Sequence, residues 1–245
     1  MTELLTDRGP RTAPDQVLVV CAHPDDVDFG AGGTVAALTD AGSSVAYCLV
    51  TSGEAGSDHL PIEADELRIL REAEQTEAAA RLGVADLTFL GYPDGQVEAS
   101  VALRGAISAS IRRVRPDLVI CQSPLRLLER IFASHPDHLA AGEATLCAVY
   151  PDSRNPRSFP EQLVNGLTPH TVAEVWLMAH PEPDLRIDVT DTFDRKLEAL
   201  RAHESQTGDR ADLEDMLRGW LRAGGEAGGL AEGRLAESFK VVTTA

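Results

Sequence analysis

The sequence of 245 residues predicts an α/β fold, namely a Rossmann-like, doubly wound and mostly parallel sheet with helices on both faces. Short apolar runs that are typical of buried strands alternate along the chain with longer segments of helical spacing. Alternation of this kind produces parallel strands, because each helix carries the chain back over the sheet to the start of the next strand.

The first apolar run, 17–22, consists of aliphatic residues and one cysteine, as expected for a strand that is buried on both faces. Pro24 prevents its continuation, because proline cannot donate to the sheet ladder. The run DLVIC at 117–121 is similar, and the segment after it has helical spacing. Strands are expected at 17–22, 45–51, 86–90, 117–121, 172–178 and 185–189, and helices at 30–41, 64–82, 100–114, 136–149, 191–204 and 211–223.

The length and composition fit one catalytic domain over 1–245, because a chain of this size with 43% hydrophobic residues can bury a full core. No linker rich in Pro, Gly or Ser divides it. Residues 1–15 are expected to form an N-terminal tail, and 151–171, with four prolines, an irregular loop of the kind that often rims a site. Residues 224–245 are expected to be a C-terminal arm, whose structure the sequence leaves open.

The charge balance limits the partners. With 22 basic and 39 acidic residues the net charge is −17, which argues against a nucleic acid or an anionic membrane and favours a small-molecule, neutral or cationic substrate. Oligomerisation stays open. The cysteines lie in apolar contexts rather than CxxC pairs, and no signal peptide or long apolar run is present, so a cytoplasmic protein is expected. These cysteines are Cys21, Cys48, Cys121 and Cys147.

The motif HPDD follows the first apolar run directly. Open α/β sheets bind ligands outside the carboxyl ends of their strands, so His23, Asp25 and Asp26 should point into the crevice. An imidazole and a carboxylate are good ligands for zinc or a similar ion, and of two adjacent aspartates one can ligate while the other takes a proton from water. The same residues also favour turns, and Asp26 could instead cap a helix.

The motif HPDH at 135–138 repeats the HPD tripeptide after the apolar run 117–121. Catalytic zinc commonly takes three protein ligands and leaves a fourth position open. His23, Asp26 and one histidine of HPDH would meet this requirement. Either histidine of HPDH alone could be a surface or helix-start residue, so the two motifs together predict the metal site.

Six blocks follow one another in a recognisable order. They are AHPDD at 22–26, VTSGEAG at 50–56, RILREAEQTEAAARLGV at 68–84, LGYPDG at 90–95, HPDH at 135–138 and KLEALRAHESQ at 196–206. In these blocks the chain, from about Val17 to Gln206, resembles the PIG-L/LmbE-like zinc-dependent N-deacetylases. That family includes deacetylases of mycothiol and bacillithiol biosynthesis.

The resemblance implies a set of metal ligands and a base. His23, Asp26 and His138 would hold the ion, which would be zinc or another divalent ion such as Fe2+. Asp25 would be the general base. The physical logic agrees, because a metal ion lowers the pKa of a bound water towards ~7 and a free carboxylate beside it can take the remaining proton.

The same resemblance implies roles for other motif residues. His135, positively charged, would donate to the oxyanion, and Asp137 would orient His135. Such a donor is commonly worth about 10² to 10³ in rate. Arg71 and Asp94 would contact hydroxyl or other polar groups of the substrate.

One position departs from the family pattern. Some sugar deacetylases of the family carry a tyrosine two residues before the first histidine of HPDH, whereas this chain has Ala133. The segment 123–134 instead brings Arg126, Glu129 and Arg130 near the site in sequence. An ordinary solvated amphipathic segment is the alternative.

Other residues favour structural roles. The run FGAGGTV at 29–35 lacks the third glycine of a dinucleotide-binding loop, so its glycines are expected to allow close helix packing. His180 lies in a second HP dipeptide, HPE, and is either a rim residue or part of a loop. His203, within the last block, makes either a buried hydrogen bond or a site contact.

The sequence therefore predicts a metal-dependent hydrolase that removes an N-acyl group, with acetyl as the expected one, from an amino sugar or amino-sugar conjugate. The alternative is an amidase for a larger amide, such as a thiol conjugate or a natural-product intermediate. A different class is a Rossmann-like binding module with a structural metal. The free acid Asp25 argues against it, because a structural site needs a closed set of ligands.

Overall fold

The computed structural model describes residues 3–56 and 61–244, and its centre is a seven-stranded sheet with the strand order β5-β4-β3-β6-β7-β9-β8. The strands β5, β4, β3, β6 and β7 are parallel. β9 runs antiparallel between β7 and β8. The strands span β3 (Gln16–Cys21), β4 (Ser44–Leu49), β5 (Asp86–Phe89), β6 (Leu118–Gln122), β7 (Glu174–Met178), β8 (Leu185–Asp188) and β9 (Ala236–Thr243).

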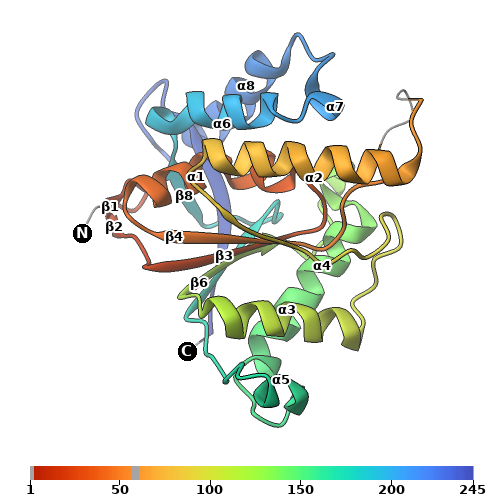
Figure 1. Cartoon of the computed structure of the whole chain (residues 1–245). Coiled ribbons are helices and arrows are strands. Elements are labelled where there is room, and N and C mark those ends of the chain that lie inside the picture. Colours follow the sequence, from red (N-terminus) through yellow and green to blue (C-terminus); the bar gives the residue numbers. More distant parts are fainter. Residues whose placement is uncertain (1–2, 57–60, 245) are drawn as a thin grey trace.

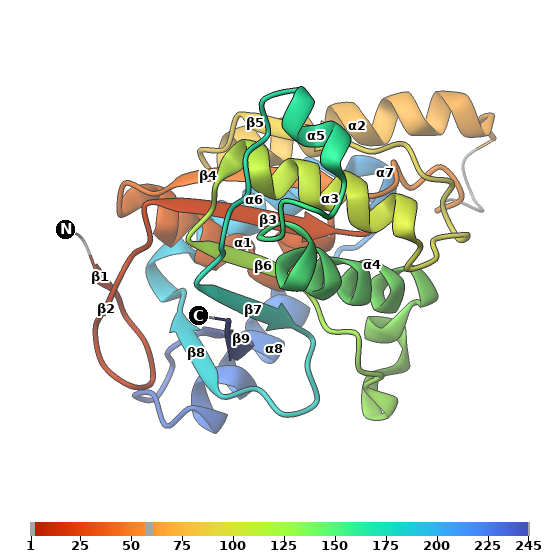
Figure 2. The ribbon, with the colours of Figure 1, turned by 90° about the horizontal axis from the view of Figure 1, so that it is seen from below.

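Helices cover both faces of this sheet, which confirms the predicted doubly wound α/β architecture (Figure 1). One face carries α1 (Asp26–Asp40), α2 (Ala64–Arg81), α6 (Phe193–Arg201) and α8 (Leu213–Ala227). The other carries α3 (Val101–Val114) and α4 (Pro136–Cys147), which Figure 2 shows in front of the strands. The short helices are η1 (Leu128–Ser134), η2 (Ala148–Asp152), α5 (Pro160–Val164), η3 (Thr190–Thr192) and α7 (Glu204–Thr207).

Strand β3 shows why its sequence is apolar without alternation. Val17 and Val19 pack into the cluster under α1 and α6, whereas Leu18 and Val20 pack into the cluster under α3 and α4. All four side chains are at most 1% exposed. A strand between two layers of helices buries both of its faces, so each position along it is apolar.

The topology fixes where a ligand can bind. The chain passes from β3 to β4 and β5 on one side, and then returns to place β6 and β7 on the other side of β3. The loops that follow β3 and β6 therefore diverge and leave a crevice at the carboxyl ends of these two strands. The HPDD motif follows β3 and the HPDH motif begins α4 after β6.

The predicted strands and main helices are present, with boundary shifts of a few residues, but three segments differ. Helix α1 begins at Asp26 instead of residue 30, so it starts within the HPDD motif. The expected irregular loop 151–171 contains the short helix α5. The expected N-terminal tail contains the hairpin of β1 (Glu3–Leu4) and β2 (Arg11–Thr12), with Leu4 buried.

The C-terminal arm contains β9, an interior strand of the sheet. The sequence concealed it because β9 carries Glu237, which is only 3% exposed and breaks the apolar pattern. The carboxylate of Glu237 accepts hydrogen bonds from the backbone N–H groups of Gly33 and Thr34 and from Nζ of Lys196. A buried charge is tolerated when it is paired and hydrogen-bonded in this way.

The glycines after β3 permit close packing, as predicted. A Cβ atom on Gly33 would lie 2.7 Å from Cβ of Val189, and one on Gly30 would lie 2.6 Å from Sδ of Met178. The cysteines are all free, and Cys147 alone is partly exposed. Among the described helices, none combines the length and the apolar character that a membrane crossing requires.

Candidate metal centre and active site

Three residues of the two HPD motifs meet at the carboxyl ends of β3 and β6. Nδ1 of His23 lies 3.2 Å from Nε2 of His138. The carboxylate of Asp26 lies 3.3 Å from Nδ1 of His23 and 3.0 Å from Nε2 of His138. The structure thus brings together the three expected ligands, with one donor atom of each facing the others.

In both histidines the ring nitrogen that points away from the cluster lies beside a hydrogen-bond acceptor. Nε2 of His23 lies 2.9 Å from Oδ1 of Asp94 and 3.3 Å from Oδ2 of Asp137. Nδ1 of His138 lies 3.3 Å from the carbonyl oxygen of Ala133. Acceptors at these positions keep the proton on the rear nitrogen, so that the lone pair of the front nitrogen points to the cluster.

The electrostatics of the cluster favour a cation. Burial alone lowers the pKa of His23, but hydrogen bonds to Asp137 and Asp26 outweigh it and raise the pKa to about 12. Burial raises the pKa of Asp26, yet the neighbouring His138 brings it well below its usual range. A field that strongly favours a proton on His23 favours a divalent ion as well, so these residues fit a metal ion.

His135 is a further donor beside this cluster. Its ring nitrogens and those of His23 and His138 include atoms that all lie within 4.8 Å of one another. The ring of His135 lies edge-on to that of His23, with 5.0 Å between the centroids. His135 could therefore reach either an ion or a substrate bound to it.

The carboxylate of Asp25 faces a different partner from that of Asp26. Its Oδ2 accepts a hydrogen bond of 3.2 Å from Nη2 of Arg71, and its backbone N–H donates to Oε1 of Gln75 at 2.8 Å. Its φ of 79° is in the left-handed region, which aspartate tolerates better than most residues. Strained backbone of this kind is common at functional sites. The two adjacent aspartates thus have separate environments, as the sequence predicts.

Arg71, expected to contact the substrate, has its guanidinium among groups of the protein. Its side chain is 3% exposed, and it donates to the carbonyl oxygens of Pro24 and Gly53 as well as to Asp25. Gly53 and Gly56 make room for it, since a Cβ atom would lie 2.1 Å and 2.4 Å from Nη1 at these two positions. The SGEAG block therefore encloses a guanidinium that holds the HPDD loop, an arrangement that favours positioning of Asp25 over a direct substrate contact.

The environment of Asp25 suits a base. Burial raises the pKa of its carboxyl to about 6, against the opposing effect of the Arg71 charge. A carboxylate with a pKa near 6 is ionised at neutral pH and yet basic enough to accept a proton.

The carboxylate of Asp137, expected to orient His135, faces other groups of the protein. This carboxylate accepts hydrogen bonds from the backbone N–H groups of Gly95 and Val97 and lies beside Nε2 of His23. Within the described residues, its link to His135 is a backbone one, because the N–H of Asp137 donates to Nδ1 of His135 at 3.2 Å. Asp137 is the second residue of α4, and its carboxylate faces the HPDD motif that follows β3.

His135 was expected to be positively charged, but its environment disfavours that form. Burial, and then the nearby His23, lower the pKa of His135 below its ordinary value. The backbone N–H that donates to Nδ1 places the single proton of the neutral ring on Nε2. A neutral His135 therefore still offers an N–H donor.

Both carboxylate oxygens of Asp94 contact other groups of the protein. Its Oδ1 lies against Nε2 of His23, and its Oδ2 accepts a hydrogen bond from the backbone N–H of Ala55. Its side chain is 7% exposed. These contacts favour support of His23 over the substrate contact expected from the sequence.

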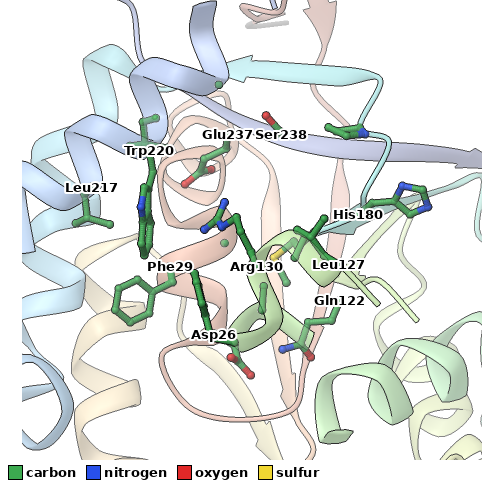
Figure 3. A pocket seen from close by; sticks show the side chains of 18 of the residues that line it. Asp26, Phe29, Gln122, Leu127, Arg130, His180, Leu217, Trp220, Glu237 and Ser238 are labelled. Carbon is green, nitrogen blue, oxygen red and sulfur yellow. The ribbon is translucent and has the colours of Figure 1, made fainter. Parts of the chain in front are cut away.

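A cavity of about 510 Å³ adjoins the cluster of His23, Asp26 and His138, and Asp26 and His138 line it. Figure 3 shows Asp26 in its wall. His180 lies on its rim. Two aromatic residues of the wall, Phe132 and Trp220, were not identified from the sequence. Phe132 lies in the segment 123–134, whose only signals were its charges, and Trp220 lies in α8, which is remote in sequence.

His203 makes a buried hydrogen bond, which is one of the two roles left open for it. The side chain is completely buried, and Nε2 lies 2.9 Å from Oδ2 of Asp28. The same carboxylate oxygen accepts a hydrogen bond from Nε2 of Gln75, the residue whose Oε1 accepts from the N–H of Asp25. The last sequence block is thus connected to the HPDD loop by buried hydrogen bonds.

Comparisons with known proteins agree with this geometry. A family model described as PIG-L, GlcNAc-PI de-N-acetylase, matches residues 18–149, which is more than half of the chain. The chain belongs to the PIG-L family. This membership confirms the resemblance seen in the motifs and identifies the chain as a hydrolase of C–N bonds other than peptide bonds.

Two curated members of the PIG-L family show the extent of the similarity. The diacetylchitobiose deacetylase of Thermococcus kodakarensis is 33% identical over 211 residues, which are 84% of this chain and 75% of the relative. The "Probable N-acetyl-alpha-D-glucosaminyl L-malate deacetylase 2" of Bacillus cereus is 34% identical over 204 residues, 81% of this chain and 86% of the relative.

A solved PIG-L structure has the same fold. The N,N'-diacetylchitobiose deacetylase from Pyrococcus horikoshii, in complex with its inhibitor MPG, superposes with a TM-score of 0.86 at 31% sequence identity. The match covers 94% of this chain and 84% of that chain.

Proposed function

We propose that this PIG-L family member is a metal-dependent N-deacetylase that removes an acyl group, with acetyl as the expected one, from the nitrogen of an amino sugar or amino-sugar conjugate. The observation that carries the proposal is the approach of His23, Asp26 and His138 to within 3.3 Å of one another, while the carboxylate of Asp25 lies outside this set and is held by Arg71. The names of the relatives, which are deacetylases of N-acetylated sugars, support the substrate class.

His23, Asp26 and His138 would hold the ion, through Nδ1, the carboxylate and Nε2. We infer zinc, or another divalent ion such as Fe2+, because two imidazoles and one carboxylate form a common catalytic zinc set. When bound, the ion would supply a Lewis acid for the amide carbonyl and would lower the pKa of a water molecule. Asp94 and Asp137 would fix the tautomer of His23 that such binding needs.

Asp25 would act as the general base. Its carboxylate is not one of the facing donor groups, and Arg71 keeps it ionised and in place. It would take a proton from the attacking water and return it to the nitrogen as the C–N bond breaks, since a base in one step can be the acid in the next. The products are a carboxylate and a free amine.

His135 would stabilise the oxyanion. Its neutral ring carries the proton on Nε2, the nitrogen that is not engaged by the N–H of Asp137. A donor of this kind acts mainly on the charge that develops in the transition state. Our proposal thus keeps the oxyanion role of His135 but assigns it to the neutral form.

A binding module with a structural metal is the less favoured class. A structural site would require a closed set of ligands, whereas the HPDD loop holds an ionisable carboxylate outside the facing donors. The expected single catalytic domain over 1–245 and the expected cytoplasmic location stay predictions, and so does a small-molecule N-acylated substrate.

The function is tested with purified protein loaded with Zn2+ and a panel of N-acetylated amino sugars and their conjugates. We expect release of free amine from at least one member, and no release by an Asp25→Asn variant with the same metal content. A protein that binds one ion per chain and yet releases amine from no member of the panel would contradict the proposal.

A further inference from the structure

The cavity beside the metal cluster extends well beyond the reacting groups. Asp26 and His138 form its wall at one end, and helix α8 and strand β9 form its other end. Figure 3 shows Asp26 at one side of this space and Leu217 and Trp220 across from it. A substrate whose amide lies at the cluster could therefore extend into the cavity without a break.

The cavity offers mainly apolar surface. Phe29, Leu127, Met178, Leu217 and Leu221 line it. These side chains come from four separate parts of the chain, so the apolar character is a property of the assembled site.

Lys196 and Glu237, which also line the cavity, are engaged within the protein. Nζ of Lys196 lies 2.7 Å from Oε1 of Glu237 and donates to the carbonyl oxygens of Asp28 and Phe29. The second carboxylate oxygen of Glu237 accepts from the N–H of Thr34. Sugar hydroxyls placed here would lose water without gaining these partners, which is costly.

Aromatic side chains close the mouth of the cavity. Phe132 of η1 and Trp220 of α8 stack with 6.2 Å between their ring centroids and 21° between their planes. The guanidinium of Arg130 lies 5.2 Å and 5.0 Å from the same two centroids. Phe132 remains 63% exposed and Trp220 38% exposed. The η1 segment thus reaches across to α8 and presents flat apolar surface to an incoming molecule.

We propose that this cavity is a specificity subsite for an apolar group carried by the substrate of the amide hydrolysis. The proposal rests on the proposed function and narrows its substrate class to N-acyl amino sugars that bear an alkyl or aryl group. A cavity of 150 Å³ already holds benzene, and this one is more than three times as large. An acetyl group alone would leave most of the apolar wall against water.

The apolar group could belong to the acyl chain or to the aglycone, and two series of substrates distinguish these sources. The first contains glucosamines with N-acetyl, N-butyryl and N-hexanoyl groups. The second contains N-acetylglucosamine glycosides with methyl, butyl and hexyl aglycones. We expect kcat/KM to rise about three- to fourfold for each buried methylene in one series and to stay flat in the other. Flat values in both series, with the parent compounds hydrolysed, would overturn the subsite.

Variants at the mouth locate the effect. Trp220→Ala and Phe132→Ala should each lower the ratio of kcat/KM between the hexyl or hexanoyl member and its short-chain parent by about tenfold. Leu128→Ala is the matched control, because Leu128 lies in the same η1 segment, is 72% exposed and does not line the cavity. An equal change of the ratio in Leu128→Ala would refute a specific role of the mouth residues.

Binding gives a readout that is independent of turnover. The chain has two tryptophans, and Trp176 is only 1% exposed. Titration with hexyl glucosaminide or hexanoate, each against its short-chain counterpart, should shift the emission of Trp220 to shorter wavelength. Trp220→Phe should abolish the shift.

These experiments distinguish a failure of the deacetylase proposal from a failure of the subsite proposal. If a probe shifts the emission but neither series nor its parents are hydrolysed, the deacetylase assignment falls and the apolar site stands. If the parents are hydrolysed and neither probe shifts the emission, the subsite falls and the deacetylase assignment stands.

Discussion

Nε2 of His203 lies 2.9 Å from Oδ2 of Asp28, and both side chains are completely buried. Gln75 donates to the same carboxylate oxygen and accepts from the N–H of Asp25. A continuous chain of hydrogen bonds therefore connects His203, within the last sequence block, with the backbone of the proposed base. A buried network of this kind can hold the left-handed conformation of Asp25, because hydrogen bonds in a chain strengthen one another.

Loss of His203 should destabilise the protein strongly. His203→Ala leaves the Asp28 carboxylate buried without its main partner, and breaking a buried pair in this way costs about 3–5 kcal/mol. Denaturant unfolding followed by circular dichroism measures the free energy of unfolding. His203→Gln keeps an N–H donor and should lose much less, and equal losses in the two variants would show that ring packing matters instead of the hydrogen bond.

The contribution of His203 should depend on pH. Burial alone lowers the pKa of His203, but the hydrogen bond and charge of Asp28 outweigh it, so the pKa is raised in the folded state. A raised pKa stabilises the fold fully below the unfolded value of about 6.5, and this stabilisation is lost as the pH rises through the folded pKa. The difference in unfolding free energy between wild type and His203→Gln should therefore be largest near pH 5.5 and shrink towards high pH. A difference that grows with pH contradicts this assignment.

His138→Ala should remove most of the bound metal. One ligand of three is lost, and the remaining imidazole and carboxylate cannot complete the set. Elemental analysis of protein purified in parallel provides the measurement. His180→Ala is the control, because His180 lies on the rim of the same cavity but outside the cluster. Equal metal content in wild type and His138→Ala would refute the ligand assignment.

Asp25→Asn should separate metal binding from turnover. The amide keeps the shape of the side chain but cannot accept the proton, so turnover should fall by at least about 10² while the metal content is unchanged. The same preparation is assayed for both quantities. If metal and activity fall in proportion, Asp25 is a ligand and the division of labour between the two aspartates is wrong.

Arg71 should set the acid limb of the pH profile. Burial raises the pKa of Asp25 to about 6, and the Arg71 charge limits this rise. Because the base must be ionised, kcat/KM should fall as the pH drops through this region. Arg71→Met removes the opposing charge, so its acid limb should lie at higher pH than that of the wild type. Arg71→Lys keeps the charge and should shift the limb less, and coinciding limbs in all three proteins would exclude the Arg71 effect.

The sequence predicted the parallel half of the sheet and the meeting of His23, Asp26 and His138, because both depend on local patterns. Continuous apolar runs mark strands that are buried on two faces, and the HPD motifs follow two of these runs. It missed β9, since the pairing of Glu237 with Lys196 exists only in the folded chain. The enclosure of the Arg71 guanidinium between Gly53 and the HPDD loop could not be predicted either, because only the fold brings these groups together.

His135→Ala should lower kcat more than it raises KM. An oxyanion donor acts mainly in the transition state, and loss of one such donor commonly costs about 10² to 10³ in kcat. The backbone N–H of Asp137 places the proton of the neutral ring on Nε2, so the charged form is not required. His135→Gln, which also offers a neutral donor, should recover part of the rate and keep the shape of the alkaline limb. His135 acts in its charged form if two results are found together. The His135→Gln variant recovers no rate, and only the wild type loses rate over the pH range in which an imidazolium would lose its proton. A rise in KM with unchanged kcat would instead make His135 a contact to the bound substrate.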